Sequence, residues 1–286
     1  RLQQRLLSTM DWENKAMSTK KMVILAAGLG SRMRRNSDEQ DDLSVEQKAA
    51  ASDGMKAMMP IGRPFLDHCL NAYADAGITE VCLVIGPTHD AIRDYYSSLE
   101  MTRITVSFAV QEQPLGTANA VAAARDFAGS DAFIVVNGDN YYPTNVIAGL
   151  VDLSTNGMAG FDPAALIEFS NIPEERIRGF GIIDRDADGN AIGILEKPTP
   201  EELAARSEGL LVNMNCFRFT PDVFPVIDAL PLSIRGEYEI TDAMRGLIQA
   251  GKQFQVVPVE AGVLDMATRG DVSAVEKVLR DRPVNL

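Results

Sequence analysis

The first half of the chain alternates between short runs of apolar, often β-branched residues and longer stretches in which apolar residues recur at helical spacing. The short runs predict strands over residues 22–27, 80–85, 104–110 and 132–137. The periodic stretches predict helices over residues 64–76, 89–99 and 117–127. Because strands that alternate with crossover helices form a mostly parallel sheet, we predict an α/β fold with a doubly wound sheet.

From about residue 160 the pattern changes, because short apolar runs follow one another with polar turns between them. We expect strands over residues 164–169, 180–184, 191–195, 211–219 and 254–259. Amphipathic helices are expected over residues 239–250 and 271–280. This half therefore predicts mixed or antiparallel sheet joined to the first half. No linker separates the two, so we expect a single domain over residues 21–286.

Two segments lie outside this pattern. Residues 1–20 are expected to form an N-terminal tail. Residues 35–54 carry several acidic side chains and few large apolar ones, which predicts a mobile acidic loop. A solvated excursion and a lid over the preceding segment both remain possible explanations of this loop.

Composition and charge narrow the classes of partner. The chain has 286 residues with 40 acidic against 27 basic side chains, giving a net charge of -13. Such a charge disfavours binding to the phosphate backbone of a nucleic acid. No apolar run has the length of a membrane span, so no membrane partner is expected. The three cysteines show neither CxxC nor CxxH spacing, which argues against a zinc site and a disulfide framework and favours the cytoplasm.

A glycine-rich turn directly follows the first predicted strand. Gly28 and Gly30 let backbone N–H groups approach phosphate oxygens, and Arg32 adds a fixed cation. Such a turn at the carboxyl edge of an α/β sheet is where ligands bind, although a purely structural turn is the alternative. Met33 stands where the dinucleotide fingerprint has its third glycine, and no Walker A sequence occurs. A nicotinamide oxidoreductase is therefore disfavoured.

Four further motifs follow the glycine turn in a fixed order: Lys56-Ala-Met-Met-Pro60, Gln111-Glu-Gln-Pro-Leu-Gly116-Thr, Asn137-Gly-Asp139-Asn and Glu196-Lys197-Pro198. With these motifs the chain resembles the sugar-1-phosphate nucleotidylyltransferases from Met22 to about Arg280. The resemblance implies a Rossmann-like mixed sheet of the nucleotide-diphospho-sugar transferase type. It also implies transfer of a nucleotidyl group from a nucleoside triphosphate to a sugar 1-phosphate, with Mg²⁺ as cofactor and a homo-oligomer as a possible assembly.

The inventory of side chains suits this chemistry. The attacking phosphate oxygen is already anionic near neutral pH, so the reaction requires no general base. A chain with only two histidines can therefore catalyse it. Positioning and neutralisation of charge on the phosphates are the main requirements. We expect His68 on the polar side of its helix and His89 at a helix start, with no catalytic role for either.

The resemblance assigns roles to residues of the nucleotide half. The expected nucleotide-binding residues are Leu25, Ala26, Ala27, Gly28, Gly30, Gln111, Gly116 and Thr117. Arg32 would face the leaving phosphates, and Lys56 the phosphate under attack. A Gln at position 111 is the family's choice for uracil or thymine, since an amide carries the donors and the acceptor that those bases can match. UTP or dTTP is therefore the expected substrate, with the two not separated.

The resemblance also implies a metal site and a sugar site. Asp139 is the expected Mg²⁺ ligand, with Asp265 as its partner. The segment around Asp265 departs from the family pattern at positions 263, 266 and 267. The sugar phosphate is expected near residues 160–265, bound by Gly181, Glu196, Lys197 and Asn213. Asn215 occupies a position that is usually glycine in relatives.

Arg32, Lys56, Asp139 and Lys197 together form the expected catalytic set. Two alternatives to the UTP or dTTP enzyme remain. The chain could be a regulatory, nucleotide-sensing protein of the same fold with little turnover, or a family member that uses another nucleoside triphosphate.

Overall fold

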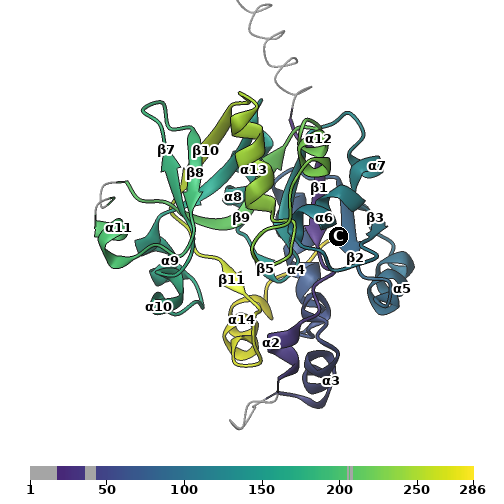
Figure 1. Ribbon diagram of the computed structural model, residues 1–286. Coiled ribbons are helices and arrows are strands. Elements are labelled where there is room, and N and C mark those ends of the chain that lie inside the picture. The colour runs from purple at the N-terminus through teal and green to yellow at the C-terminus, as the bar shows by residue number, and fades with distance from the viewer. Residues whose placement is uncertain (1–17, 36–42, 205, 207–208) are drawn as a thin grey trace, which may run out of the picture.

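A twisted sheet of nine strands forms the centre of the computed structural model, which describes residues 18–35, 43–204, 206 and 209–286 (Figure 1). Seven of these strands follow one path across the sheet in the order β10-β6-β9-β4-β1-β2-β3. Their bounds in chain order are β1 (Lys21–Leu25), β2 (Glu80–Ile85), β3 (Thr105–Val110), β4 (Phe133–Asn137), β6 (Asn156–Phe161), β9 (Val212–Phe219) and β10 (Phe254–Val259).

The first half forms the parallel part of this sheet. β1 lies between β2 and β4 and pairs with both in parallel, and β3 extends the sheet beyond β2. Because alternate side chains of a strand point to opposite faces, Met22 and Ile24 enter one hydrophobic cluster while Val23 enters another. Helices cover both faces, which is the doubly wound arrangement that the sequence predicts.

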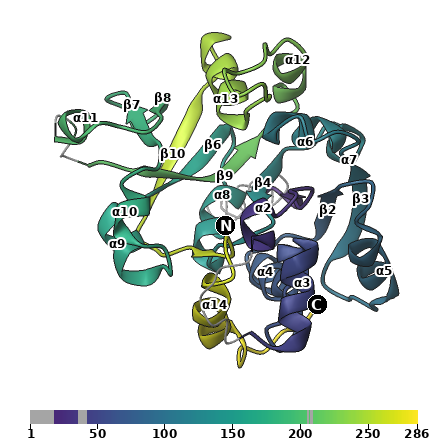
Figure 2. The same ribbon diagram turned by 60° about the horizontal axis from the view of Figure 1, so that its bottom comes forward.

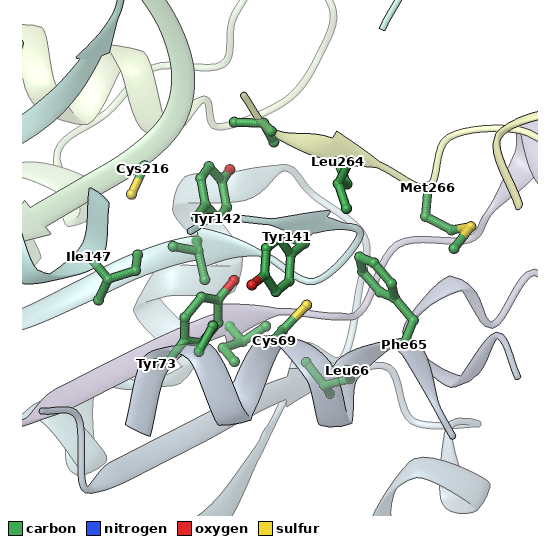
Figure 3. Close-up of a cluster of buried hydrophobic side chains, with 14 of the residues drawn as sticks. Phe65, Leu66, Cys69, Tyr73, Tyr141, Tyr142, Ile147, Cys216, Leu264 and Met266 are labelled. Atoms are coloured by element: carbon green, nitrogen blue, oxygen red, sulfur yellow. The ribbon is translucent and has the colours of Figure 1, made fainter. Parts of the chain in front are cut away.

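One of these clusters lies between helix α4 (Phe65–Asp75) and the short strands beside the main sheet (Figure 3). Cys69 and Tyr73 of α4 point toward Tyr141 and Tyr142, and the Tyr73 hydroxyl donates to the Asn140 carbonyl at 3.3 Å. On the opposite face, α6 (Thr117–Ala123) packs Ala118 and other small side chains against the second cluster. The ends of strands β1 and β4 are thus held by packing from both sides.

The second half adds antiparallel pairing. β9 runs antiparallel to both β4 and β6, and a hairpin of β7 (Ile182–Arg185) and β8 (Ala191–Leu195) continues from β9. A separate two-stranded sheet joins β5 (Asn140–Tyr141) to β11 (Leu264–Asp265). In Figures 1 and 2 the hairpin and the helices near it form a lobe at one side of the parallel core. The predicted mixed sheet is therefore confirmed.

The remaining helices fill the connections between strands. Their bounds are α2 (Ser31–Arg34), α3 (Val45–Asp53), α5 (Asp90–Ser98), α7 (Arg125–Ala128), α8 (Thr144–Val151), α9 (Pro163–Phe169), α10 (Glu174–Ile177), α11 (Pro200–Ala204), α12 (Val223–Asp228), α13 (Ile240–Gln249) and α14 (Asp271–Leu279), with a 3₁₀ turn at Lys56–Met58. Within the described residues, no helix is both long and apolar enough to cross a bilayer.

Near residue 160, one predicted element is wrong and one strand was missed. Residues 164–169, expected as a strand, belong to α9, whose first turn is capped by the Asp162 carboxylate accepting from the Ala165 amide at 2.8 Å. The true strand is β6, which the sequence analysis missed because it is rich in glycine. A Cβ at Gly157 would lie 2.7 Å from the Gln255 carbonyl oxygen of the neighbouring strand β10, as well as 2.6 Å from a Leu153 methyl group, so only glycine fits there.

The acidic loop predicted over residues 35–54 is also wrong in part, because it contains α3. Ser44 caps this helix, because its hydroxyl oxygen accepts from the Gln47 backbone amide. The Gln47 side-chain oxygen accepts in turn from the Ser44 backbone amide, which completes a capping box. Gly54 ends the helix with a φ of 71°, and the helix lies beside α2 (Figure 2). The middle of the expected loop, residues 36–42, and most of the expected tail, residues 1–17, lie outside the described residues.

His68 does not lie on a polar side of its helix as predicted. Its side chain is buried on α4, and neither ring nitrogen has a hydrogen-bond partner among the residues that the structure describes. Burial lowers the pKa of His68 below its ordinary value. The imidazole is therefore held neutral inside the protein.

Candidate nucleotide and metal site

A cavity of about 470 Å³ opens at the carboxyl ends of β1, β3 and β4. The predicted nucleotide-binding residues all line it, namely Leu25, Ala26, Ala27, Gly28, Gly30, Gln111, Gly116 and Thr117. Lys56 and Asp139 line the same cavity. Parallel strands bring their carboxyl ends to one edge of a sheet, which is why positions far apart in the sequence meet here.

Close backbone contacts shape the glycine turn. Gly30 adopts a φ of 61°, and a Cβ on it would lie 2.3 Å from the Gly54 carbonyl oxygen. Arg34 donates from Nη2 to the Asp53 carbonyl at 2.7 Å, and Arg269 donates from Nε to the Met33 carbonyl at 3.1 Å. The turn is thus held against the end of α3, and only glycine fits at position 30.

Arg32 is separated from these residues. It lies on α2, its side chain is exposed, and it does not line the cavity. Among the described residues it makes neither an ion pair nor a side-chain hydrogen bond. The structure therefore does not bring this predicted catalytic residue into the cavity.

Lys56 and Asp139 form the charged centre of the cavity. The Lys56 Nζ lies 2.8 Å from Asp139 Oδ2, and the lysine side chain is 15% exposed against 31% for the aspartate. Lys56 starts the 3₁₀ turn after α3, while Asp139 follows the end of β4. This pair places one cation and one carboxylate where the glycine turn can present its backbone amides to a phosphate.

Asp265 lies on the small two-stranded sheet next to Asp139; it is buried and does not line the cavity. It pairs in register with Asn140, whose Nδ2 donates to Asp265 Oδ1 at 3.2 Å, and the next amide, of Met266, donates to the Asp139 carbonyl at 2.8 Å. The second carboxylate oxygen of Asp265 forms an ion pair with Arg176. Burial raises the pKa of Asp265 to about 6, with a further contribution from the Asp139 charge, and Arg176 opposes this rise.

The donor set near these carboxylates fits Mg²⁺. Two aspartates from adjoining segments offer hard oxygen ligands, and Mg²⁺ is commonly held by one or two carboxylates with substrate phosphates completing its shell. Within the described ranges, no group of three or more His, Cys, Asp or Glu side chains is arranged so that it could hold a metal ion. Each of the two carboxylates instead forms an ion pair with a basic side chain of the protein, Asp139 with Lys56 and Asp265 with Arg176.

Gln111 is fixed at the opposite side of the cavity, next to Gly116. Its Nε2 donates to the Gly116 carbonyl and to Asn119 Oδ1, each at 2.9 Å. Gly116 has a φ of 110°, and a Cβ there would lie 2.5 Å from the Tyr238 carbonyl oxygen. The Thr117 hydroxyl accepts from the Ile240 amide at 2.9 Å. The loop after β3 is therefore clamped by the segment before α13.

The predicted sugar-phosphate residues gather elsewhere: Asn213 lies on β9, Gly181 directly precedes β7, and Glu196 and Lys197 directly follow β8. The Asn213 amide donates to the Gly181 carbonyl at 2.9 Å, and a Cβ on Gly181 would lie 3.2 Å from Glu196 Oε2. Lys197 follows Glu196 with a φ of 49°, and both side chains are exposed. None of these residues lines the cavity.

Asn215 provides a test of the departure noted in the sequence. Its φ is 55°, the left-handed region that glycine adopts most easily. The Asn213 side chain stabilises this conformation by accepting from the Asn215 amide at 2.9 Å. The replacement of glycine by asparagine therefore retains the backbone shape, since asparagine is among the residues that tolerate this region.

Comparison with known proteins now adds a family to this geometry. The nucleotidyl transferase family matches residues 21–265. The chain belongs to this family.

Relatives of this nucleotidyl transferase include a glucose-1-phosphate thymidylyltransferase of Streptomyces griseus, 30% identical over 260 residues, covering 91% of this chain and 66% of the relative. The low-salt glycan biosynthesis nucleotidyltransferase Agl11 of Haloferax volcanii is 32% identical over 267 residues, covering 92% and 67%. The chain thus spans about two thirds of the length of these relatives. A UTP-bound UDP-glucose pyrophosphorylase of Acinetobacter baumannii has the same fold, with a TM-score of 0.69, 18% identity and coverage of 91% and 93%.

Several residues of the nucleotidyl transferase site were not found from its sequence. His89 lines the cavity and accepts from the Gly86 amide at 3.2 Å through Nδ1, and burial lowers its pKa. Its position just after the carboxyl end of β2 was a usable signal. Asn119 and Arg176 act through contacts with residues on other turns and strands, and no local sequence signal indicates such contacts.

Proposed function

We propose that the chain transfers a nucleotidyl group from UTP or dTTP to a sugar 1-phosphate and releases pyrophosphate. The observation that carries this proposal is the single cavity in which the glycine turn, Lys56, Asp139 and Gln111 meet. A bound triphosphate needs amide hydrogen-bond donors and a cation. A bound nucleobase needs a polar side chain that hydrogen-bonds to its edge and an apolar surface against its ring. The cavity offers these features together.

In the proposed reaction, an oxygen of the sugar 1-phosphate attacks the α-phosphorus of the nucleoside triphosphate. The new P–O bond forms as the bond to the β-phosphate oxygen breaks, and pyrophosphate leaves with the electron pair. No proton has to be removed from the attacking oxygen. The protein's task is therefore to align the two phosphates and to neutralise their charge.

Each charged residue has a place in this proposal. Asp139 and Asp265 would hold Mg²⁺, which would supply positive charge to the triphosphate. Lys56 leaves Asp139 for the phosphate under attack, or bridges the two, since its three N–H donors serve both. Lys197 holds the sugar phosphate, while Gly181, Glu196 and Asn213 contact the sugar. Arg32 draws near the leaving phosphates, which requires movement of an exposed side chain.

The proposed location is the cytoplasm, and the proposed assembly is a homo-oligomer. Three free cysteines, Cys69, Cys82 and Cys216, are buried, and burial raises the pKa of Cys82 to about 11. A reducing compartment suits thiols that take no part in a disulfide. Light scattering on the purified protein measures the assembly, and a monomer at all concentrations would contradict that part of the proposal.

A substrate panel tests the proposed activity directly. The purified protein is incubated with Mg²⁺, each common nucleoside triphosphate and a series of sugar 1-phosphates, while pyrophosphate release and nucleotide-sugar formation are followed. We expect product from UTP or dTTP, and none when Mg²⁺ is chelated. A strong preference for GTP, or product formation that does not depend on metal, would contradict the proposal.

The second candidate is a regulatory nucleotide-binding protein of the same fold. One observation favours it: Arg32 and Lys197, both assigned to catalysis, lie outside the cavity with exposed side chains. Triphosphate binding without product from any sugar 1-phosphate in the panel would support this candidate and reject the enzyme.

A further inference from the structure

The side-chain amide of Gln111 is held in one orientation by its neighbours. Its backbone amide donates to the Ile85 carbonyl at 2.9 Å, which fixes the residue at the end of β3 beside β2. Its Nε2 donates to the Gly116 carbonyl and to Asn119 Oδ1, each at 2.9 Å. An amide nitrogen has two hydrogens. Both are therefore used inside the protein.

The oxygen of the same amide remains for a ligand. Gln111 lines the cavity, and within the described part of the chain its Oε1 has no hydrogen-bond partner given by the structure. A rotated Gln111 amide would place Oε1 against the Gly116 carbonyl oxygen, which cannot become a donor, and, in the observed orientation of Asn119, against Asn119 Oδ1 as well. Repulsion between like partial charges thus disfavours the rotated form.

We propose that Asn119 is a positioning residue that makes Gln111 an acceptor-only reader of the base. This inference rests on the proposed function and deepens it, because it states which bases the cavity accepts. Asn119 stands in the first turn of α6, does not line the cavity and acts only through Gln111. The Gly116 carbonyl accepts one hydrogen bond from the Gln111 side-chain amide, and Asn119 accepts the other; together they hold its orientation.

An acceptor-only amide favours a base with a ring N–H group. Uracil and thymine carry such a donor at N3, and Gln111 Oε1 can accept from it. Cytosine has a lone pair at N3, which would face the lone pairs of Oε1. A site built around a hydrogen bond discriminates strongly against an analogue that leaves its partner unpaired. UTP and dTTP are therefore accepted and CTP is rejected. This selection needs only the acceptor oxygen of Gln111 and no donor from its side chain.

Binding of nucleoside triphosphates by calorimetry tests the role of Asn119. Asn119→Leu keeps the side-chain size and removes the acceptor, so the rotated amide then meets one opposing oxygen instead of two. We expect the ratio of UTP to CTP affinity to fall about tenfold, the effect of one hydrogen bond. Asn119→Asp is the matched control. It retains an acceptor and has no donor, so the affinity ratio should stay at or above the wild-type value even if its charge weakens all triphosphates equally.

Asn119→Ala repeats the test with a residue that favours helix, and thermal unfolding of each variant shows that the fold is retained. A wild-type ratio in Asn119→Leu and Asn119→Ala overturns the inference. A lower ratio of UTP to CTP affinity in Asn119→Asp than in the wild type also overturns the inference, because Asn119 would then act as a hydrogen-bond donor. Failure of the proposed function is a different result: the wild-type protein binds UTP selectively but forms no nucleotide sugar. If the wild-type protein binds no triphosphate, both are overturned.

Discussion

The two halves of the molecule present their functional residues in different ways. In the parallel half, the carboxyl ends of β1, β3 and β4 bring the predicted nucleotide residues around one cavity. In the antiparallel half, Gly181 and Asn213 are joined by a hydrogen bond, but the neighbouring Glu196 and Lys197 are exposed and outside that cavity. Parallel pairing assembles a site at one sheet edge, whereas the β7–β8 hairpin leaves the residues after its second strand in solvent.

Removal of the charge in the nucleotide half should have the largest effect. Lys56→Met eliminates the cation that faces Asp139, and we expect turnover to fall by about two to three powers of ten. Arg32→Met should be comparably slow if the exposed side chain moves to the leaving phosphates. Lys48→Met, on the exposed surface of α3, is the matched control for loss of a lysine. Near-normal turnover in Lys56→Met would reject the assigned role of that residue.

A change in the sugar half should separate the two binding events. We expect Lys197→Met to raise KM for the sugar 1-phosphate about tenfold to a hundredfold, since it removes one charge-assisted contact to phosphate. Affinity for the nucleoside triphosphate should not change, because Lys197 does not line the nucleotide cavity. Steady-state kinetics and calorimetry measure the two quantities separately. Equal weakening of both substrates would contradict a division of the site between the halves.

Two glycines of the same turn should differ in their effect on stability. Gly30→Ala forces a side chain into a left-handed conformation and against the Gly54 carbonyl, so we expect a loss of about 1–3 kcal/mol in the free energy of unfolding. Gly28→Ala meets nothing within 4 Å and is the control, with a change near zero. Denaturant unfolding measures both. Similar losses in the two variants would show that the contact between the turn and α3 is not what requires Gly30.

The smallest expected effect concerns pH and His68. Burial lowers its pKa, Arg63 and Arg282 add to this, and Asp67 opposes it. His68 and Asp75 both line a small cavity beside α4, so the Asp75 carboxylate also faces the imidazole's surroundings. Since the unfolded chain binds the proton more readily, His68 lowers the free energy of unfolding as pH falls through about 6.5, its unfolded pKa, and has no such effect above it. His68→Leu should therefore flatten the stability profile below pH 6.5. An unchanged slope there would mean that His68 has the same pKa in the folded and the unfolded state.

The sequence predicted the parallel half well because its signals are local. Strand β2 has the predicted bounds, and β1, β3 and β4 differ from them by one or two residues at an end. The elements that were misread depend on context. β6 contains Gly157 and Gly160, which weaken the strand pattern and are explained by the backbone and side chains packed against them in the fold. For α3 the signal was present, since Ser44 and Gln47 are spaced as a capping box, but the acidic composition was given more weight.

Contacts inside the site were harder to predict for a physical reason. Asp265 and Arg176 are 89 residues apart and form an ion pair because β11 and α10 happen to meet. The same holds for Lys56 and Asp139, which are 83 residues apart. Residue type and motif order suggested which side chains have functional roles. They did not show which of those side chains neutralise one another before a substrate arrives.

The position of α3 has an electrostatic consequence for the glycine turn. A helix carries a partial negative charge at its carboxyl end, and α3 ends at Gly54, on the wall of the nucleotide cavity. That polarity is opposite to the helix amino terminus with which many proteins attract phosphate. Arg34 donates to the last carbonyl of the helix, at Asp53, and so offsets this repulsion beside the cavity. The inserted helix thus supports the turn sterically while its unfavourable field is compensated by an arginine of the adjoining helix.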